Sequence, residues 1–269
     1  MDRTLLITLH TVQDQLKRRS FHVLLAVGVF FVLILRGCYD ANYTVNGQPL
    51  SGIEIAWHAS LFAFQLIAGG MLLLSVLITT QVFPADHADG SMVFYLTRPV
   101  SRNQYVMGRL LGLWLLVVAF MFVLHATVFL IAWQKTGAVI PGFLWASLLC
   151  CLNLLFVVIL TSLLSFLMPG FPGAAVTMLI IVVGFISDGG QRLLDSGMGR
   201  NVLHDVALRH VAWWRLLYPK PYMVQHYAVT VISGDEFYRF GPVHPLVNVL
   251  LYCAVLTAML LLVFQRKEI

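Results

Sequence analysis

The stretch from Pro84 to Gly112 reads PADHADGSMVFYLTRPVSRNQYVMGRLLG and joins two long apolar runs. It gathers acids, arginines, prolines and glycines in a chain that is 59% hydrophobic and only 11% charged. A soluble globular protein carries about 25% charged residues. Because so few polar residues are available to cover a surface, the sequence predicts an integral membrane protein, and it predicts that this stretch lies outside the membrane.

Six apolar runs are long enough, or nearly so, to cross about 30 Å of hydrocarbon at about 1.5 Å per residue. The first and the fifth runs are the shortest. We therefore expect an all-α integral membrane fold of six transmembrane helices, in a single domain over residues 1–269. The expected spans are 21–36, 58–83, 105–133, 142–168, 171–187 and 244–264.

Basic residues indicate how the chain is oriented. They lie at 17–19 before the first span, and at Arg98 and Arg102 between the second and third spans. The short loops on the opposite side contain only Arg36 and Lys135. The positive-inside rule therefore predicts that both termini are cytoplasmic.

Residues 1–20 precede the first span. Leu5, Leu9, Val12 and Leu16 recur at helical spacing and form one apolar face. We interpret this segment as an interfacial helix that lies along the inner membrane surface. The alternative is an ordinary cytosolic start to the first membrane helix.

The segment 188–243 is expected to lie outside, before the last span. Residues 203–217 follow helical spacing, and 222–232 form an apolar stretch that is too short to span. We expect a helical pair that is surface-lying or partly re-entrant. Gly189 and Gly190, after the fifth run, are expected to end its helix.

The spans contain few ionisable side chains. Arg109 lies near the start of the third run and is expected to snorkel to the interface. His125 lies deep in that run, and it is expected to be a hydrogen-bonded packing residue. Ion-driven carriers place acids or chains of histidines at mid-membrane, so the sequence disfavours a secondary carrier or channel.

Several other functions lack their sequence patterns. The chain contains no GxxxxGK[ST] phosphate loop, and its net charge of +5 is too small to argue for nucleic acid. The cysteines and the external histidines lack metal-ligand spacing. Nothing arranges these histidines with Asp205 or Asp235 as a nucleophile and base, so a membrane enzyme ranks last. We therefore expect no metal and no cofactor in this chain.

The stretch that joins spans two and three has its own local pattern. Asp86 and Asp89 are expected at the start of a short helix, where the helix dipole favours acids. Pro99 disfavours helix just before it, and Ser101 with Gln104 matches a capping box that begins the next helix. The pattern predicts a short helix, a break and a capped helix on the cytoplasmic face.

The short helix carries apolar side chains outside the membrane, including Met92, Tyr95 and Leu96. A solvated loop does not explain them, so lipid or a protein partner is expected to cover them. Gly108 and Gly112 form a GxxxG pattern at the start of the third span, which allows close helix packing.

Three short motifs stand in this stretch: Asp86-x-x-x-Gly90, Leu96-x-Arg98-Pro99-Val100-Ser101-Arg102, and Gly108-Arg109. Together they resemble the segment between spans two and three of ABC-2-type transporter permeases. The plan of the whole chain is similar to that family too, and the subgroup it most resembles includes the permease of the nitrous-oxide-reductase maturation system. The chain departs from the family in having aspartate where glutamate is usual, His87 where a basic residue is common, and Gly-Arg in place of Gly-Lys.

The resemblance implies that residues 84–104 contain a coupling helix, which docks on a separate ATPase subunit that holds ATP and magnesium. It implies a non-catalytic subunit of the bacterial or archaeal cytoplasmic (inner) membrane, paired with a second copy or a paralogue. Of the two acids, Asp86 is expected to take the family's acidic position. The expected coupling residues are Asp86, Asp89, Gly90, Met92, Tyr95, Leu96, Arg98, Pro99, Ser101 and Arg102.

The expected function is export of an apolar or amphipathic substrate, because polar residues are sparse in the spans. A possible substrate path would include Gln65, Thr80, His125 and Asn153. The alternative is a membrane subunit that relays ATP-driven motion to an external partner protein at 188–243. Membrane lipid is the remaining expected partner.

Overall fold

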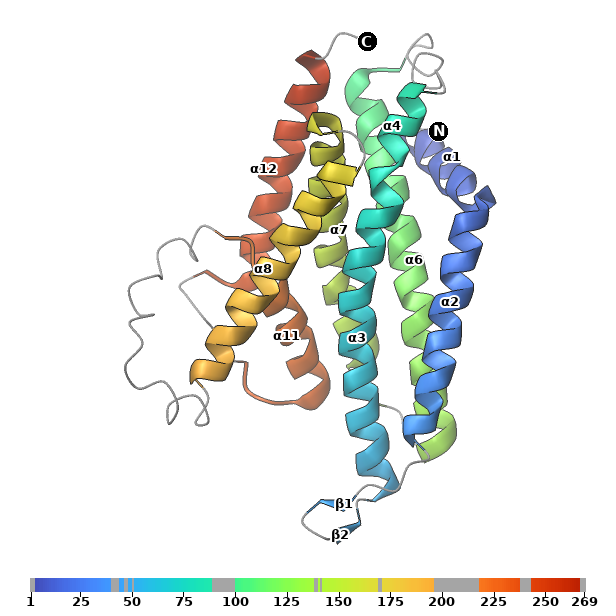
Figure 1. Cartoon of the computed structure of the whole chain (residues 1–269), viewed down its shortest axis with the longest axis vertical. Helices are drawn as coiled ribbons and strands as arrows, with labels where there is room; N and C mark the ends of the chain where they lie inside the picture. Colours follow the sequence, from blue (N-terminus) through green and yellow to red (C-terminus); the bar gives the residue numbers. More distant parts are fainter. Residues whose placement is uncertain are drawn as a thin grey trace.

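The protein is a bundle of long helices in the computed structural model (Figure 1). The structure describes residues 3–39, 44–45, 48–49, 51–88, 100–137, 140, 142–168, 171–195, 218–237 and 243–266.

Among the described residues the two strands form an antiparallel pair, in which Thr44 pairs with Pro49. In chain order the elements are α1 (Arg3–Lys17), α2 (Arg19–Leu35), the 3-10 helix η1 (Arg36–Tyr39), β1 (Thr44–Val45), β2 (Gln48–Pro49), α3 (Gly52–Thr80), α4 (Val82–Ala88), α6 (Arg102–Thr136), α7 (Phe143–Leu167), α8 (Phe171–Asp195), α11 (Pro221–Ser233) and α12 (Pro245–Arg266).

The expected all-α membrane fold is confirmed. Among the described residues, five helices are long and apolar enough to cross a membrane, namely α3 continued by α4, α6, α7, α8 and α12. The expected first span corresponds to α2, whose apolar part, Phe21–Ile34, is shorter than the other five. Hydropathy therefore located all six apolar helices, and α2 is the one whose length falls short.

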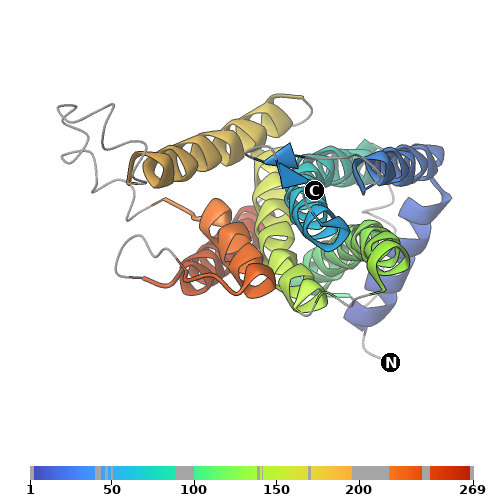
Figure 2. The same ribbon diagram turned by 90° about the horizontal axis from the view of Figure 1, so that it is seen from below.

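Helix α7 stands at the centre of the bundle, with α11 and α12 on one side of it and α3 and α6 on the other (Figure 2). In its most apolar window 67% of residues are buried, against 22% for α12. An apolar residue in the membrane faces either protein or lipid, so α7 is the packed core and α12 presents most of its surface outward. Leu251, Val255 and Leu262 are among the exposed side chains of α12.

Helix α6 is longer than the hydrocarbon requires. Its 35 residues extend about 52 Å, whereas the hydrocarbon core is about 30 Å thick. It begins with the predicted capping box, in which the Ser101 hydroxyl accepts from the Gln104 amide and the Gln104 side chain accepts from the Ser101 amide. The helix ends at Gly137, which has a left-handed backbone with φ of 66°. The first turns of α6 are therefore free to project past the hydrocarbon.

The structure corrects the expected end of the fifth span. Helix α8 continues through Gly189 and Gly190 to Asp195, so these glycines do not end it. A glycine ends a helix when its backbone turns left-handed, and neither of these two has a positive φ. The expected helix at 203–217 lies outside the described residues.

The apolar stretch at 222–232 forms helix α11, which is buried in the bundle and packs against α7, α8, α12 and α3. Met223, Val224 and Ala228 are each at most 2% exposed. Asn153 of α7 holds the start of α11, because its side-chain amide donates to the Pro221 carbonyl oxygen at 2.8 Å. The surface-lying alternative is therefore wrong for this helix, and the partly re-entrant alternative stays a prediction.

Replacing Asn153 with alanine should lower the free energy of unfolding by about 1 kcal/mol, because the tertiary hydrogen bond to α11 is lost. In a chain of this size that corresponds to a fall in melting temperature of about 3 °C. Thermal unfolding of the solubilised protein measures it. Ser162→Ala is the matched control, since the buried Ser162 hydroxyl donates to the Val158 carbonyl oxygen of its own helix. Equal melting temperatures for the two variants would contradict the anchoring role.

Candidate functional site

Helix α4 extends the end of α3 past a single non-helical residue, Gln81, and includes Asp86. The expectation that Asp86 begins a short helix is wrong, because it is the fifth residue of α4. Pro84 is tolerated as the third residue, since the first turn of a helix has no intrahelical partner for its N–H groups. An acid in the second turn gains little from the helix dipole, so Asp86 depends on another partner.

That partner is Arg109, on the second turn of α6. Its Nη2 lies 2.8 Å from Asp86 Oδ1, and the Tyr105 hydroxyl donates to Asp86 Oδ2 at 2.6 Å. Asp86 is 7% exposed, Arg109 3% and Tyr105 is fully buried. The expectation that Arg109 snorkels is therefore wrong, because an interior carboxylate stabilises its charge better than a long reach to water does.

Arg109 also contacts the N-terminal helix. Its Nη1 lies 3.3 Å from Thr11 Oγ1 and 3.5 Å from Asp14 Oδ2. The side chain of Asp14 is 47% exposed, so the outer edge of this group reaches the surface. We call these five residues, from α1, α4 and α6, the Arg109 cluster; they are Thr11, Asp14, Asp86, Tyr105 and Arg109.

The cluster is possible because α1 approaches α6 very closely. A Cβ added to Gly112 would lie 2.6 Å from Thr11 Cβ, and one added to Gly108 would lie 2.8 Å from Ile7 Cβ. The Thr8 hydroxyl lies 3.2 Å from the Gly108 carbonyl oxygen. The GxxxG pattern thus does allow close packing, and its partner is α1.

Helix α1 buries its polar face. Thr8, Thr11 and Gln15 are at most 5% exposed, whereas Leu5 and Leu9 are each more than 40% exposed. A leucine face turned outward beside a membrane bundle fits a helix that lies in the interface, and that location stays a prediction. Helices α1 and α4 and the first turns of α6 meet at one end of the bundle, where α12 also ends (Figure 1).

The described part of the expected coupling segment includes Ser101 and Arg102. Ser101 caps α6, and Arg102 Nη1 donates to the Gln265 carbonyl oxygen near the end of α12 at 3.1 Å. Arg102 is therefore one of the expected coupling residues, and it also links α6 to the last span, α12. The other expected coupling residues, Asp89, Gly90, Met92, Tyr95, Leu96, Arg98 and Pro99, lie outside the described residues.

The four residues of the expected substrate path lie in different places. Gln65 lines a cavity of about 440 Å³, and Thr80 lines another of about 350 Å³ beside Pro84. His125 is buried, with Nδ1 2.8 Å from Ser147 Oγ and its ring stacked on Phe64. The Asn153 side chain donates to the Pro221 carbonyl oxygen at the start of α11. A path that joins all four stays a prediction, and His125 has the hydrogen-bonded packing position expected for it.

A comparison with protein families identifies the kind of molecule that the fold indicates. A model of a family described as ABC-2 family transporter protein matches residues 15–188. This chain belongs to the ABC-2 transporter family. A comparison with curated proteins gave no match.

The matched part of this ABC-2 protein covers α2 to most of α8, and so includes Asp86, Tyr105 and Arg109. Proteins of this family are membrane components of ABC transporters that work with ATPase subunits. The Arg109 cluster was not foreseen as a unit, although one signal was available. Tyr105 and Arg109 are four residues apart, and side chains at that spacing share one face of a helix.

Proposed function

We propose that this chain is the permease subunit of an ABC exporter, and that residues 84–104 receive the motion of a separate ATPase subunit. The observation that supports this most directly is the buried Asp86–Arg109 pair. It joins the beginning of the proposed coupling segment to α6, and through Thr11 and Asp14 to α1.

The physical argument is that a buried ion pair resists separation. Removing one partner of such a pair costs about 3–5 kcal/mol, because the other charge stays buried without compensation. A push on α4 should therefore move α1 and α6 with it, as one body, before it breaks the cluster. The Arg102 bond to Gln265 extends the same connection to α12. This is the rigid-body kind of transition by which helices are rearranged around a transport route.

The rest of the proposal concerns partners and location. The permease works as two copies, or with a paralogue, in a bacterial or archaeal cytoplasmic membrane with both termini in the cytoplasm. The ATPase subunits hold ATP and magnesium, and their surface covers Met92, Tyr95 and Leu96. The cargo is apolar or amphipathic, since the polar groups of the spans are few and many of their hydroxyls donate within their own helices.

The docking surface is tested with Arg98→Glu and Arg102→Glu. Each change should lower capture of the ATPase subunit that co-purifies with the full chain by about tenfold, or about 1.4 kcal/mol, because it reverses a charge at the contact. Arg266→Glu is the control, as an exposed arginine at the end of α12. Since Arg102 also bonds to Gln265, its variant is judged only if it unfolds like the parent. Unchanged capture by Arg98→Glu would refute the docking surface.

A second candidate function is that the permease relays motion to an external protein, as in a cofactor-assembly machine. The burial of α11 favours it, because a segment held between α3, α7 and α8 would move with the spans. Purification from the native membrane distinguishes the two functions. A tightly bound external protein, with no cargo between the permeases, would favour relay over export.

A further inference from the structure

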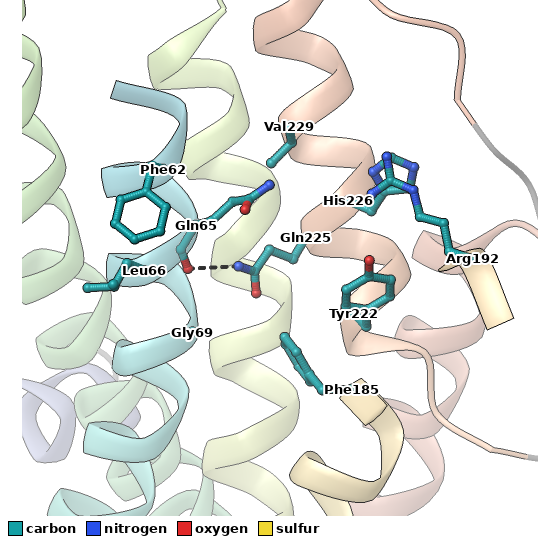
Figure 3. Close-up of a pocket in the computed structure, with 10 residues that line it drawn as sticks. All are labelled: Phe62, Gln65, Leu66, Gly69, Phe185, Arg192, Tyr222, Gln225, His226 and Val229. Carbon is teal, nitrogen blue, oxygen red and sulfur yellow. Dashed lines mark hydrogen bonds between the residues drawn. The ribbon is translucent and has the colours of Figure 1, made fainter. Parts of the chain in front are cut away.

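A cavity of about 440 Å³ lies between α3, α8 and α11. Figure 3 shows Gln65 of α3 facing Gln225 of α11, with His226 and Arg192 farther from α3 and with Phe62 and Leu66 on another side of α3. The α11 residues and Arg192 lie beyond the range that matches the family model, 15–188, so family membership says nothing about their role. The cavity is also separate from the Arg109 cluster, which lies where α1, α4 and α6 meet.

Two polar side chains of the cavity are buried without being satisfied. His226 is 6% exposed, and neither of its ring nitrogens has a hydrogen-bond partner among the described residues. Gln225 is 7% exposed; its Nε2 donates to the Gln65 carbonyl oxygen at 2.9 Å, and its Oε1 has no partner in the described part of the chain. Buried polar groups are nearly always bonded, so two adjacent exceptions in one cavity indicate a missing binding partner.

The charge of the cavity indicates the kind of partner. The Arg192 guanidinium lies beside the His226 ring (Figure 3), and forms no ion pair with any described residue. Burial, and then the Arg192 charge, lower the pKa of His226 to about 4, and Asp235 opposes them with a smaller effect. The ring is therefore neutral at pH 7 and presents one N–H donor. No acid is among the described residues that line the cavity. A guanidinium beside a neutral N–H donor suits a phosphate or carboxylate and repels a metal cation.

The apolar part of the cavity lining suits a hydrocarbon chain. Phe62 and Leu66 come from α3 and are 57% and 36% exposed, and Phe185 comes from α8. Their apolar surface continues to the outside of the bundle, where a membrane helix meets lipid tails. A free inorganic anion would leave this apolar lining uncovered, whereas an amphiphile covers the polar and the apolar lining together.

We propose that this cavity binds an amphiphile with an anionic head group, with the head on Arg192, His226 and Gln225 and the chain along Phe62 and Leu66. Binding needs no ATPase, so the site stands or fails independently of the coupling proposed above. Whether the bound molecule is cargo or a resident lipid does not change the chemistry of the site.

The test uses the full chain in nanodiscs of phosphatidylcholine, titrated with phosphatidylglycerol, and native mass spectrometry to count bound lipids. Wild type should bind phosphatidylglycerol in preference to phosphatidylcholine. Arg192→Gln should weaken that binding by about tenfold, because the charge-assisted bonds are lost. Arg266→Gln, which removes an exposed arginine far from the cavity, should leave it unchanged.

A second variant guards against misfolding. His226→Phe keeps an aromatic ring, removes two unsatisfied nitrogens, and should unfold at the same temperature as wild type or higher. It should still weaken phosphatidylglycerol binding. Equal affinity for the two lipids, or full affinity in both cavity variants, would overturn the proposal. If inorganic phosphate competes as strongly as the lipid does, the site takes a free anion and the amphiphile is excluded.

Discussion

Replacing Arg109 with methionine is expected to lower the melting temperature of the solubilised protein by about 10 °C. The change leaves the Asp86 carboxylate, whose side chain is 9% exposed, buried without its cation. Breaking a buried ion pair in this way costs about 3–5 kcal/mol, and each kcal/mol shifts the melting temperature of a chain this long by about 2–4 °C. Because methionine fills a space similar to that of arginine, the fall in melting temperature comes mainly from the lost charge and not from lost packing.

A double variant distinguishes loss of the Asp86–Arg109 ion pair from loss of the Arg109 side chain as such. Asp86→Asn with Arg109→Met removes both charges and keeps an acceptor for the Tyr105 hydroxyl, so it should recover much of the stability lost in Arg109→Met alone. Arg266→Met is the control for losing an arginine from an exposed position. The pairing is refuted if the double variant unfolds below the single one, or if Arg109→Met behaves like the control.

Replacing both Gly108 and Gly112 with alanine is expected to displace α1 from α6. The two new methyl groups would meet Ile7 Cβ at 2.8 Å and Thr11 Cβ at 2.6 Å. For Gly112 the Thr8 carbonyl oxygen is also only 2.9 Å away, and a helix backbone does not give way as a flexible side chain does. Overpacking costs about 1–3 kcal/mol at each site. The separation also removes Thr11 and Asp14 from Arg109.

The measurement is trypsin cleavage at residues 17–19, between α1 and α2, which should become faster as α1 detaches. Gly70→Ala is the matched control, because a Cβ there would meet no atom within 4 Å. Alanine favours a helix over glycine by about 1 kcal/mol, so the control should be slightly stabilised while the double variant is destabilised. If both variants changed the cleavage rate and the stability in the same direction, the close contact between α1 and α6 would be contradicted.

Local features of this protein were predictable from its sequence. Hydropathy placed α3, α6, α7, α8 and α12, because any segment that crosses lipid must satisfy its backbone internally and be apolar along its length. The start of α6 was predictable as well, since the Ser101–Gln104 capping box involves residues only three positions apart. The resemblance carried by the stretch from Asp86 to Arg109 led to the ABC-2 family, and the matched range supports it.

The predictions that failed are those in which a local signal competed with a distant partner. Glycines such as Gly189 and Gly190 often end a helix, yet α8 continues through both of them. Asp86 is a residue type that is common at the start of a helix, yet it lies inside α4. Of the two alternatives for 222–232, the surface-lying helix is wrong, because α11 lies against α7. The sequence signal was present in each case, and the surrounding fold decided its use.

What the sequence by itself determined is therefore the membrane class, the apolar helices and the cap of α6. All of these follow from hydropathy along a segment or from hydrogen bonds within one helical turn. Only the tertiary structure decided that Arg109 pairs with Asp86 and Thr11, which are 23 and 98 residues away along the chain. It also decided that His226 and Arg192 share one cavity. The physical reason is that a buried charge takes whichever partner the packed helices bring within reach, and that partner has no fixed spacing in the sequence.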